Sequence, residues 1–403
     1  MKKRIFIAMH YMEIGGAETS LIGLLQAMDY TRYDVDLFVF SHQGELMQFI
    51  PKEVNLLPED SIYSELERPL KDVIKRGHLG IAYGRLKGKL LFQRYVRSGK
   101  PKESAAIFQY IGNAVTPFLH TLYRYGEYDI AISFLNPHNI VAEKVKAKKK
   151  ICWIHTDYTK IDINKDIELP VWEKYDHIVS ISPDVTTTFL TVFPSLKNKI
   201  VEIENILSSE FVKNRAEQVP QSEILTEMPL ETNVTRILSV GRFSAPKNYD
   251  NVPDICKRIN RLGQKVKWYI IGYGDMESQI RNKIHEAGME NDVILLGKRN
   301  NPYPYIKSCD IYVQPSRYEG KSVTVREAQM LLKPVVVTDY PTAHSQVKDM
   351  VDGVIVPMDN SGCAEGIYRF INNKRLQEAI CSHLKSCDYG NMNEIMKLYK
   401  LID

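Results

Sequence analysis

Two loops in the second half of the chain combine charged residues with glycine, which suits binding of phosphate and sugar. In the first loop Arg242 follows Gly241, and Lys247 comes five residues after Arg242. Glycine lets the backbone come close to a ligand, and each cation near a diphosphate adds a favourable Coulomb interaction. The pattern therefore predicts a diphosphate site, and an exposed basic loop is the alternative.

The second loop carries a carboxylate in front of a glycine and the start of a predicted helix. Glu319 precedes Gly320, and Glu327 lies eight residues after Glu319. A carboxylate accepts hydrogen bonds from hydroxyl groups, while free backbone amides donate hydrogen bonds to sugar and phosphate oxygens. We expect Glu319 to contact a sugar and Glu327 to contact a ribose diol; ordinary surface charges are the alternative.

Both loops follow predicted strands, because short β-branched runs alternate with helical stretches along the chain. In the first half the predicted strands are 4–9, 35–40, 129–134, 150–154 and 176–180, with a helix over 17–28. In the second half they are 236–240, 266–271, 293–296, 310–314, 334–338 and 353–356, with helices near 248–262, 275–288, 322–332 and 361–373. Repeated strand–helix–strand units predict parallel sheets. Two such sets predict two doubly wound, Rossmann-like domains facing each other, with the site in the cleft at their strand ends.

Two further stretches set the predicted domain boundaries. Residues 213–235 contain Pro220 and Pro229 and no periodic apolar face, so we expect a linker with a surface excursion. Residues 384–403 have apolar residues at helical spacing and predict one amphipathic helix. The predicted division is 1–206, 207–385 and a helix over 386–403 that packs back toward the first domain.

The second-half motifs resemble the retaining glycosyltransferases of family 4, which have the GT-B fold. The resemblance rests on Gly241-Arg242 with Lys247, on Glu319 with Glu327, on Ala328 and on the run 334–338, and it covers most of the second half. In the first half, residues 15–18 (Gly-Gly-Ala-Glu) and 155–157 (His-Thr-Asp) lie where that family has its glycine loop and active-site histidine.

The resemblance implies a role for each matching residue. Arg242 and Lys247 would bind the donor diphosphate, and Glu319 would contact the transferred sugar near the reacting carbon. The implied roles of the others are Gly320 and the amides of Lys321, Ser322 and Val323 for sugar and phosphate, Glu327 for the ribose, Gly16 for close approach to the phosphates, and His155 beside the sugar. Lys321 departs from the apolar aromatic residue that the family often has at this position, so the resemblance does not identify the donor sugar.

The resemblance also implies the reaction. The expected enzyme is a hexosyltransferase that moves a sugar from a nucleotide-diphosphate sugar, with UDP as the expected nucleotide, to a hydroxyl of a glycan or lipid-linked glycan, as in bacterial cell-surface polysaccharide synthesis. The first domain would bind the acceptor and the second the donor, without a metal ion, another cofactor or nucleic acid. A sugar-nucleotide epimerase of the same two-domain shape and a non-catalytic binding homologue are the alternatives.

Two glycine patterns argue against other nucleotide-binding classes. Residues 320–322 resemble the end of a P-loop, but Pro315 stands where that motif needs a glycine. Residues 272–274 (Gly-Tyr-Gly) follow a predicted strand, but Glu277 replaces the third glycine of a dinucleotide fingerprint. A tight turn is the better interpretation of 272–274.

Composition and charge favour a globular protein with peripheral membrane contact. The 403 residues are 44% hydrophobic and carry a net charge of +4, and the six cysteines lack zinc-site spacing. We read Asp34 and Asp36 as charges at a strand edge and the cysteines as buried reduced thiols. The chain has no apolar run long enough to span a membrane, so a cytoplasmic location is expected.

A basic segment over 85–102 is the expected membrane contact. It holds seven cations and no acid, with Leu86, Leu90, Leu91 and Tyr95 at helical spacing among them. This pattern is typical of a helix that lies on an anionic lipid surface. Each cation near such a surface adds about 1 kcal/mol of binding free energy, and the inner face of the plasma membrane is the expected surface. A solvated basic face on a core-packed helix is the alternative.

Overall fold

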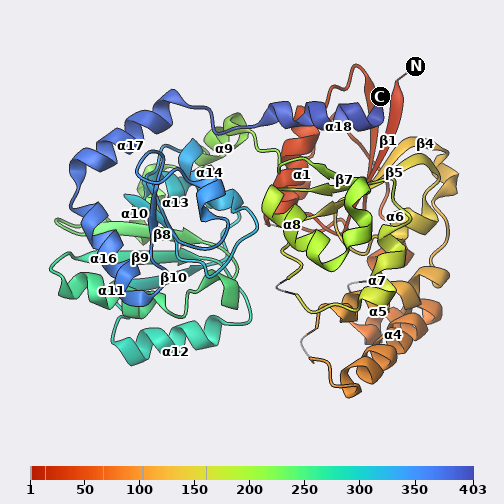
Figure 1. The fold of residues 1–403 in the computed structure, drawn as a ribbon, viewed down its shortest axis with the longest axis horizontal. Coiled ribbons are helices and arrows are strands. Elements are labelled where there is room, and N and C mark those ends of the chain that lie inside the picture. Colours follow the sequence, from red (N-terminus) through yellow and green to blue (C-terminus); the bar gives the residue numbers. More distant parts are fainter. Residues whose placement is uncertain (1, 14, 67, 102–103, 160) are drawn as a thin grey trace. The chain divides into compact units, whose positions relative to one another are not determined.

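A computed structural model of the chain describes residues 2–13, 15–66, 68–101, 104–159 and 161–403 (Figure 1). The chain divides into two compact units. Unit 1 comprises Met1–Leu207 together with Met392–Asp403, and unit 2 comprises Ser208–Asn391. Each unit is built on its own sheet, so each is described separately.

Unit 1 contains a seven-stranded parallel sheet in the order β3-β2-β1-β4-β5-β6-β7. Its strands are β1 (Lys3–Met9), β2 (Tyr33–Val39), β3 (Asn55–Leu56), β4 (Tyr128–Ser133), β5 (Ala147–Ile154), β6 (His177–Ser180) and β7 (Ile200–Glu202). The order runs outward in both directions from the β1–β4 pair. Strand order therefore reverses between β1 and β4, which is the topological switch point of a doubly wound sheet.

Most helices of unit 1 lie in the connections between these strands, and α18 at the end of the chain packs against the same unit (Figure 1). They are α1 (Gly16–Ala27), α2 (Ser61–Ser64), α3 (Leu70–Lys75), α4 (Leu79–Arg97), α5 (Ala106–Val115), α6 (Asn139–Lys144), α7 (Lys165–Trp172), α8 (Pro183–Val192) and α18 (Ile395–Ile402), with 3₁₀ turns η1 (Glu45–Phe49), η2 (Thr116–Phe118), η3 (Tyr123–Tyr125), η4 (Pro194–Lys199) and η6 (Met392–Glu394). Helix α18 is anchored by Tyr399, whose ring stacks on Tyr33 at 4.8 Å. Just beyond the helix, the side-chain carboxylate of Asp403 accepts from Lys3 and Arg32 at 3.0 and 2.6 Å.

Unit 2 contains a six-stranded parallel sheet in the order β10-β9-β8-β11-β12-β13. Its strands are β8 (Thr235–Val240), β9 (Val266–Ile271), β10 (Val293–Gly297), β11 (Ile311–Gln314), β12 (Val335–Thr338) and β13 (Val354–Val356). Strands β8, β11 and β12 are buried almost throughout, because helices cover both faces. The prediction of two doubly wound parallel-sheet domains is confirmed.

The helices of unit 2 form a layer on each face of its sheet. They are α9 (Ser209–Ala216), α10 (Gln221–Glu227), α11 (Val252–Arg261), α12 (Glu277–Ala287), α13 (Tyr303–Ser308), α14 (Val323–Met330), α15 (Ala343–Gln346), α16 (Asn360–Ile371) and α17 (Lys374–Ser386), with the 3₁₀ turn η5 (Ala245–Lys247). Apolar residues of α11, α12, α16 and α17 form one continuous core with the strands. The residues after β9 are not the tight turn that we expected at 272–274, because the turn lies just beyond them, at residues 275–276. Gly272 instead allows close packing, since a side chain there would lie 2.0 Å from the carbonyl oxygen of Gly241.

Two predicted elements differ from the structure. Residues 213–235, expected to be a linker, contain the end of α9 and all of α10, and α10 buries Ile224 while Met228 is buried just beyond it. The helix expected over 384–403 is interrupted, because α17 ends at Ser386 and α18 begins at Ile395. In the interruption the Asp388 carboxylate accepts from the backbone N–H of Gly390 and from the Ser209 hydroxyl, which fixes a turn.

Candidate functional site

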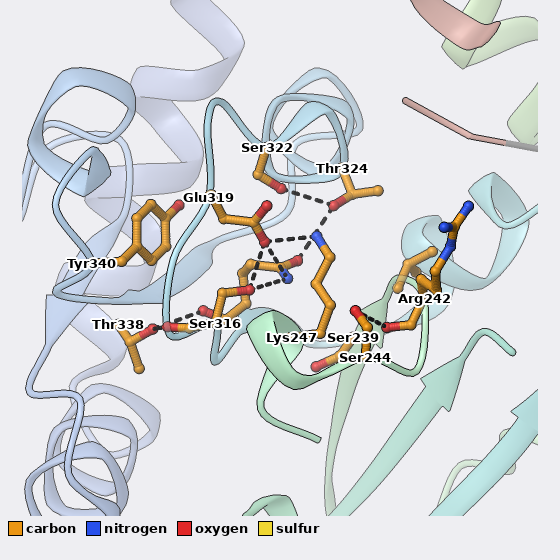
Figure 2. Close-up of polar contacts among 12 residues, drawn as sticks. Ser239, Arg242, Ser244, Lys247, Ser316, Glu319, Ser322, Thr324, Thr338 and Tyr340 are labelled. Atoms are coloured by element: carbon orange, nitrogen blue, oxygen red, sulfur yellow. Dashed lines mark hydrogen bonds and ion pairs between the residues drawn. The ribbon is translucent and has the colours of Figure 1, made fainter. Parts of the chain in front are cut away.

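The two loops singled out by sequence come from neighbouring strands at the switch point of unit 2. Strands β8 and β11 pair in parallel, with Tyr312 opposite Leu238. Their carboxyl ends therefore meet at the same edge of the sheet, where doubly wound sheets bind ligands. This pairing brings together Lys247, from the loop after β8, and Glu319, from the loop after β11 (Figure 2).

The Glu319 carboxylate is held through a single oxygen. Its Oε1 accepts from Lys247 Nζ at 2.7 Å, from Ser316 Oγ at 2.6 Å and from Gln314 Nε2 at 3.2 Å (Figure 2). Gln314 and Ser316 are fully buried, so they fix the direction of the carboxylate. None of the described residues donates to Oε2, which leaves that oxygen able to accept a ligand hydroxyl.

Lys247 reaches Glu319 from a 3₁₀ turn and not from the helix that we expected to start near Asn248. Helix α11 begins at Val252, and the backbone between them bends because Asn248 has the left-handed conformation with φ 61°. Gly241 makes room for the lysine, since a side chain there would lie 3.1 Å from Lys247 Cε. The cation is therefore placed by a turn and a glycine, with no helix dipole behind it.

Arg242 does not join this cluster. Its side chain is exposed and extends away from Lys247 and Glu319 (Figure 2). Within the described chain its guanidinium has no hydrogen bond or ion pair. Arg242 lies on the same loop as Lys247 and is free to turn toward an anion.

The two loops are clamped together by Arg317, which sequence reasoning did not identify. Its backbone N–H donates to the Pro246 carbonyl at 2.7 Å, and its guanidinium donates to the Ala245 carbonyl. The same guanidinium forms a bidentate pair with Asp250 at 3.1 and 2.9 Å. Because each contact joins residues far apart in sequence, no local pattern could have revealed this clamp.

The loop that contains Gly320 leads into α14, but the backbone amides at its end are not equally available to a ligand. The Ser322 N–H donates to Gln346 Oε1 at 3.0 Å, and Gln346 donates back to the Ser322 carbonyl. Val323 is the first residue of α14, and its N–H belongs to the first turn, which has no intrahelical acceptor. Ser322 does not cap this turn through its side chain, so the α14 N-terminus keeps amides that can bind an anion.

Glu327 lies deeper in the same unit than its predicted role suggests. It is 3% exposed, and its Oε1 accepts from the Tyr303 hydroxyl at 2.7 Å. Burial raises the pKa of Glu327 to about 7, and the Tyr303 hydrogen bond and the charge of Arg215 oppose that rise. Burial therefore favours the protonated form of this carboxyl far more than exposure to water would.

Gly16 and His155 belong to unit 1. Gly16 is the exposed first residue of α1, and His155 follows β5 directly. His155 Nε2 lies 3.0 Å from the Phe134 carbonyl, so Nε2 carries the proton and Nδ1 is an acceptor. The protein atoms around the ring lower the pKa of His155 to about 4, which keeps the imidazole neutral at pH 7.

The basic segment lies mainly on α4, which packs on α5. Gly84 and Gly88 allow the close approach, since side chains there would lie 2.8 Å from the Ala114 carbonyl and 2.6 Å from Ile111 Cα. Leu86 and Leu90 are exposed among the cations, whereas Leu91 and Tyr95 are half-buried. Lys102, the last cation of the segment, is outside the described residues.

The described parts of the chain have neither a cluster of metal-binding side chains nor a helix that could cross a membrane. They contain no group of three or more His, Cys, Asp or Glu side chains arranged to hold a metal ion. No described helix is both long enough and apolar enough to span a bilayer.

Sequence comparison connects unit 2 to glycosyl transfer. Residues 221–383, less than half of the chain, match the family model for glycosyl transferases group 1. Campylobacter jejuni N-acetylgalactosamine-N,N'-diacetylbacillosaminyl-diphospho-undecaprenol 4-alpha-N-acetylgalactosaminyltransferase is 30% identical over 152 residues, which is 37% of this chain and 41% of that protein. Staphylococcus aureus poly(ribitol-phosphate) alpha-N-acetylglucosaminyltransferase is 24% identical over 176 residues, covering 43% of this chain and 34% of that protein. The chain thus spans less than half the length of these curated relatives.

Structural comparison extends over the whole chain. Anabaena HepE in complex with UDP and glucose has a TM-score of 0.69 at 16% identity, with 99% of both chains covered. A mutant of S. aureus TarM in complex with fondaparinux, alpha-GlcNAc-glycerol and UDP has a TM-score of 0.69 at 13% identity, with both chains fully covered. At such low identities the similarity shows the fold alone. The TM-scores over the whole chain confirm the predicted GT-B fold. Together, the comparisons support a glycosyltransferase of this fold.

Proposed function

We propose that the protein is a retaining, family 4 glycosyltransferase that moves a sugar from a UDP-sugar to a hydroxyl of a glycan or lipid-linked glycan. The observation that carries this proposal is the meeting of Lys247 and Glu319 at the switch point of unit 2. A cation and a fixed carboxylate share one strand-end site there, next to the N-terminus of α14. A diphosphate needs the cation and the amides, and a sugar ring needs the carboxylate.

In the proposed reaction the bond between the anomeric carbon and the diphosphate oxygen breaks, and the acceptor oxygen bonds to the same face of that carbon. Positive charge develops on the sugar ring and negative charge on the leaving diphosphate. Lys247, Arg242 and the α14 amides would stabilise the leaving group. Glu319 Oε2 would accept a hydroxyl of the sugar, and the acceptor proton would pass to the leaving phosphate oxygen.

The remaining predicted residues have supporting roles in this proposal. Glu327 would accept from the ribose hydroxyls, and Gly16 would allow the N-terminal loop to approach the phosphates. The neutral His155 would accept a sugar hydroxyl at Nδ1. Because Lys247, Arg242 and the α14 amides supply the positive charge, the proposed reaction needs no metal ion, and turnover in EDTA tests this.

The names of relatives support the donor and the acceptor class. UDP is the nucleotide named in the Anabaena and S. aureus complexes. The Campylobacter relative acts, by its name, on a diphospho-undecaprenol-linked sugar, and both named transferases are alpha-transferases. A lipid-linked acceptor also fits α4, whose exposed cations Lys87, Lys89, Arg94 and Arg97 would attract an anionic membrane surface.

Donor binding and product analysis test the proposed function. UDP should raise the melting temperature more than inorganic phosphate does, and the Lys247→Met variant should lose most of that rise. With acceptor present, NMR of the product from an alpha-linked UDP-sugar should show an alpha glycoside. A beta product would refute retention, and conversion of the donor without acceptor into its epimer would refute transfer.

Vesicle binding tests the membrane proposal. Changing Lys87, Lys89, Arg94 and Arg97 together to Gln should abolish co-sedimentation with vesicles containing anionic lipid. Vesicles of phosphatidylcholine alone are the matched control, to which neither protein should bind. Unchanged binding of the variant to anionic vesicles would remove α4 from this role.

A further inference from the structure

Unit 1 contains a cavity at the switch point of its own sheet, and its lining includes none of the residues singled out by sequence for the donor. It has a volume of about 290 Å³, at the small end of ligand pockets. Its lining includes His10, just after β1, and Asn136 and Pro137, in the loop after β4. Helix α5 supplies five lining residues, and α4 and α7 supply one each, Arg85 and Glu168. The cavity therefore occupies the position where doubly wound sheets bind ligands.

Most of the lining is aliphatic or aromatic, including Leu66, Phe108, Ile111, Val115, Ile140 and Ile163. The polar side chains among them are largely engaged by other protein groups. Gln109 Nε2 donates to the Asn113 and Asn139 side chains at 3.0 and 3.3 Å, and Thr116 Oγ1 donates to the Gly112 carbonyl at 2.7 Å. These groups are committed to the protein.

The acid in the lining is engaged in the same way. Glu168 Oε1 accepts from the Tyr158 hydroxyl at 2.7 Å and from the Trp172 indole at 3.2 Å. Burial raises the pKa of Glu168, which favours its uncharged form. A sugar would need several uncommitted donors and acceptors, so the lining favours an apolar occupant.

Helix α4, which packs on α5 and lines the cavity through Arg85, presents an exposed apolar stripe. Leu79, Tyr83, Leu86 and Leu90 lie at positions i, i+4, i+7 and i+11 of α4, and all four are exposed. Phe108 of α5 lines the cavity and is 71% exposed, so it stands at the mouth. An apolar surface flanked by cations is complementary to an anionic lipid layer, and this surface lies on the helix that packs against α5, the main helix of the lining.

We propose that this cavity binds the apolar chain of a lipid that carries the acceptor, an acyl or prenyl chain entering past Phe108 from the layer on which α4 rests. Arg85 of α4 also lines the cavity and is fixed by donation to the Glu65 and Arg68 carbonyls at 3.1 and 2.5 Å. Its positive charge would lie near a phosphate that joins chain and sugar. That the bound lipid chain belongs to the acceptor rests on the proposed function. That an apolar lipid chain binds in this cavity does not.

Displacement of a fluorescent probe tests the cavity. N-phenyl-1-naphthylamine should brighten on binding the protein, and dodecyl phosphate below its micelle concentration should displace it, whereas methyl glucoside should not. Ala105→Trp, which fills the cavity from its half-buried wall, should weaken dodecyl phosphate binding at least tenfold. Phe108→Asp at the mouth should weaken it as well, and Tyr123→Asp, an exposed aromatic outside the lining, should not.

Two results would overturn the proposal. Displacement by methyl glucoside and not by dodecyl phosphate would assign the cavity to a glycan, and equal binding by wild type, Ala105→Trp and Phe108→Asp would place the probe elsewhere. If Ala105→Trp unfolds, Phe108→Asp decides, because its side chain is exposed. The UDP-induced rise in melting temperature is measured on the same proteins. Its absence in wild type would count against the proposed function alone, and the probe result would still decide the cavity.

Discussion

Neutralising Glu319 should strengthen UDP binding while it abolishes most turnover, because in the ligand-free protein this carboxylate holds the cation that a diphosphate needs. Lys247 Nζ lies 2.7 Å from Glu319 Oε1, and the two side chains are only 20% and 11% exposed. At an effective dielectric near 20, unit charges at that distance attract by about 6 kcal/mol before desolvation is subtracted. A net value of about 1.5–3 kcal/mol is usual for a hydrogen bond to a charged group.

Glu319→Gln keeps a hydrogen-bond acceptor beside Lys247, so it should release only part of that net energy. A release of about 1 kcal/mol lowers the UDP Kd by roughly fivefold. Turnover should fall by about 10²–10³, the usual effect of removing one electrostatic contact to the transition state. Calorimetry with UDP and steady-state assays with a UDP-sugar measure the two effects separately.

Glu365→Gln is the matched control, since Glu365 is an exposed acid of unit 2 that pairs with Arg369 on α16. It should change neither UDP affinity nor turnover. If Glu319→Gln bound UDP more weakly than wild type, or kept turnover within threefold, the proposed division of labour between Lys247 and Glu319 would be wrong.

The remaining predictions concern the other residues of unit 2. Lys247→Met should weaken UDP binding by about 10–100-fold in calorimetry, whereas Arg242→Gln, which removes an exposed cation, should weaken it by only about threefold; equal losses would contradict the structure. Burial raises the pKa of Glu327 to about 7 from 4.5, so the folded state retains a proton that the unfolded chain releases, and the free energy of unfolding should fall by on the order of 3 kcal/mol between pH 4.5 and 7. In urea unfolding at pH 5 and pH 8, the free energy of unfolding of Glu327→Gln should change less between the two pH values than that of wild type. An equal change in both proteins would show that the pKa of Glu327 is not raised. Glu327→Gln should also raise the donor KM more than it lowers kcat, because ribose contacts are the same in the ground and transition states. Arg317→Met should lower kcat/KM about tenfold by freeing the loop held to Asp250, and retained activity would show that the clamp does not position the site.

Much of the fold could be predicted from sequence because its signals are local. The apolar β-branched runs 236–240 and 334–338 are strands in the structure, within a residue at either end. Parallel sheets covered on both faces require such runs, and a strand–helix–strand order fixes their handedness. The errors were also local. Helix α10 was missed because it has only seven residues and buries only Ile224, so no helical periodicity of apolar residues is visible in its sequence.

The candidate site was predictable only in part. The types and spacing of Lys247 and Glu319 were visible, since a glycine, a cation and an acid beside strand ends point to phosphate and sugar chemistry. Gln314, at the end of β11, and Ser316, two residues beyond it, precede Glu319 by five and three residues. Two polar residues at the end of an apolar strand could have indicated that the carboxylate accepts hydrogen bonds from them. The Arg317 clamp gave no such signal, because its partner Asp250 is 67 residues away.

By itself, the sequence determined which residues could bind a diphosphate and a sugar, and that two parallel sheets would carry them. Those properties depend on side-chain chemistry and on the periodicity of short segments. The tertiary structure decided that Lys247 pairs with Glu319, that Arg242 stays exposed, and that Glu327 is buried with a raised pKa. Distances, desolvation and competition between partners depend on groups that the chain brings together from distant positions, so they exist only once the fold has formed.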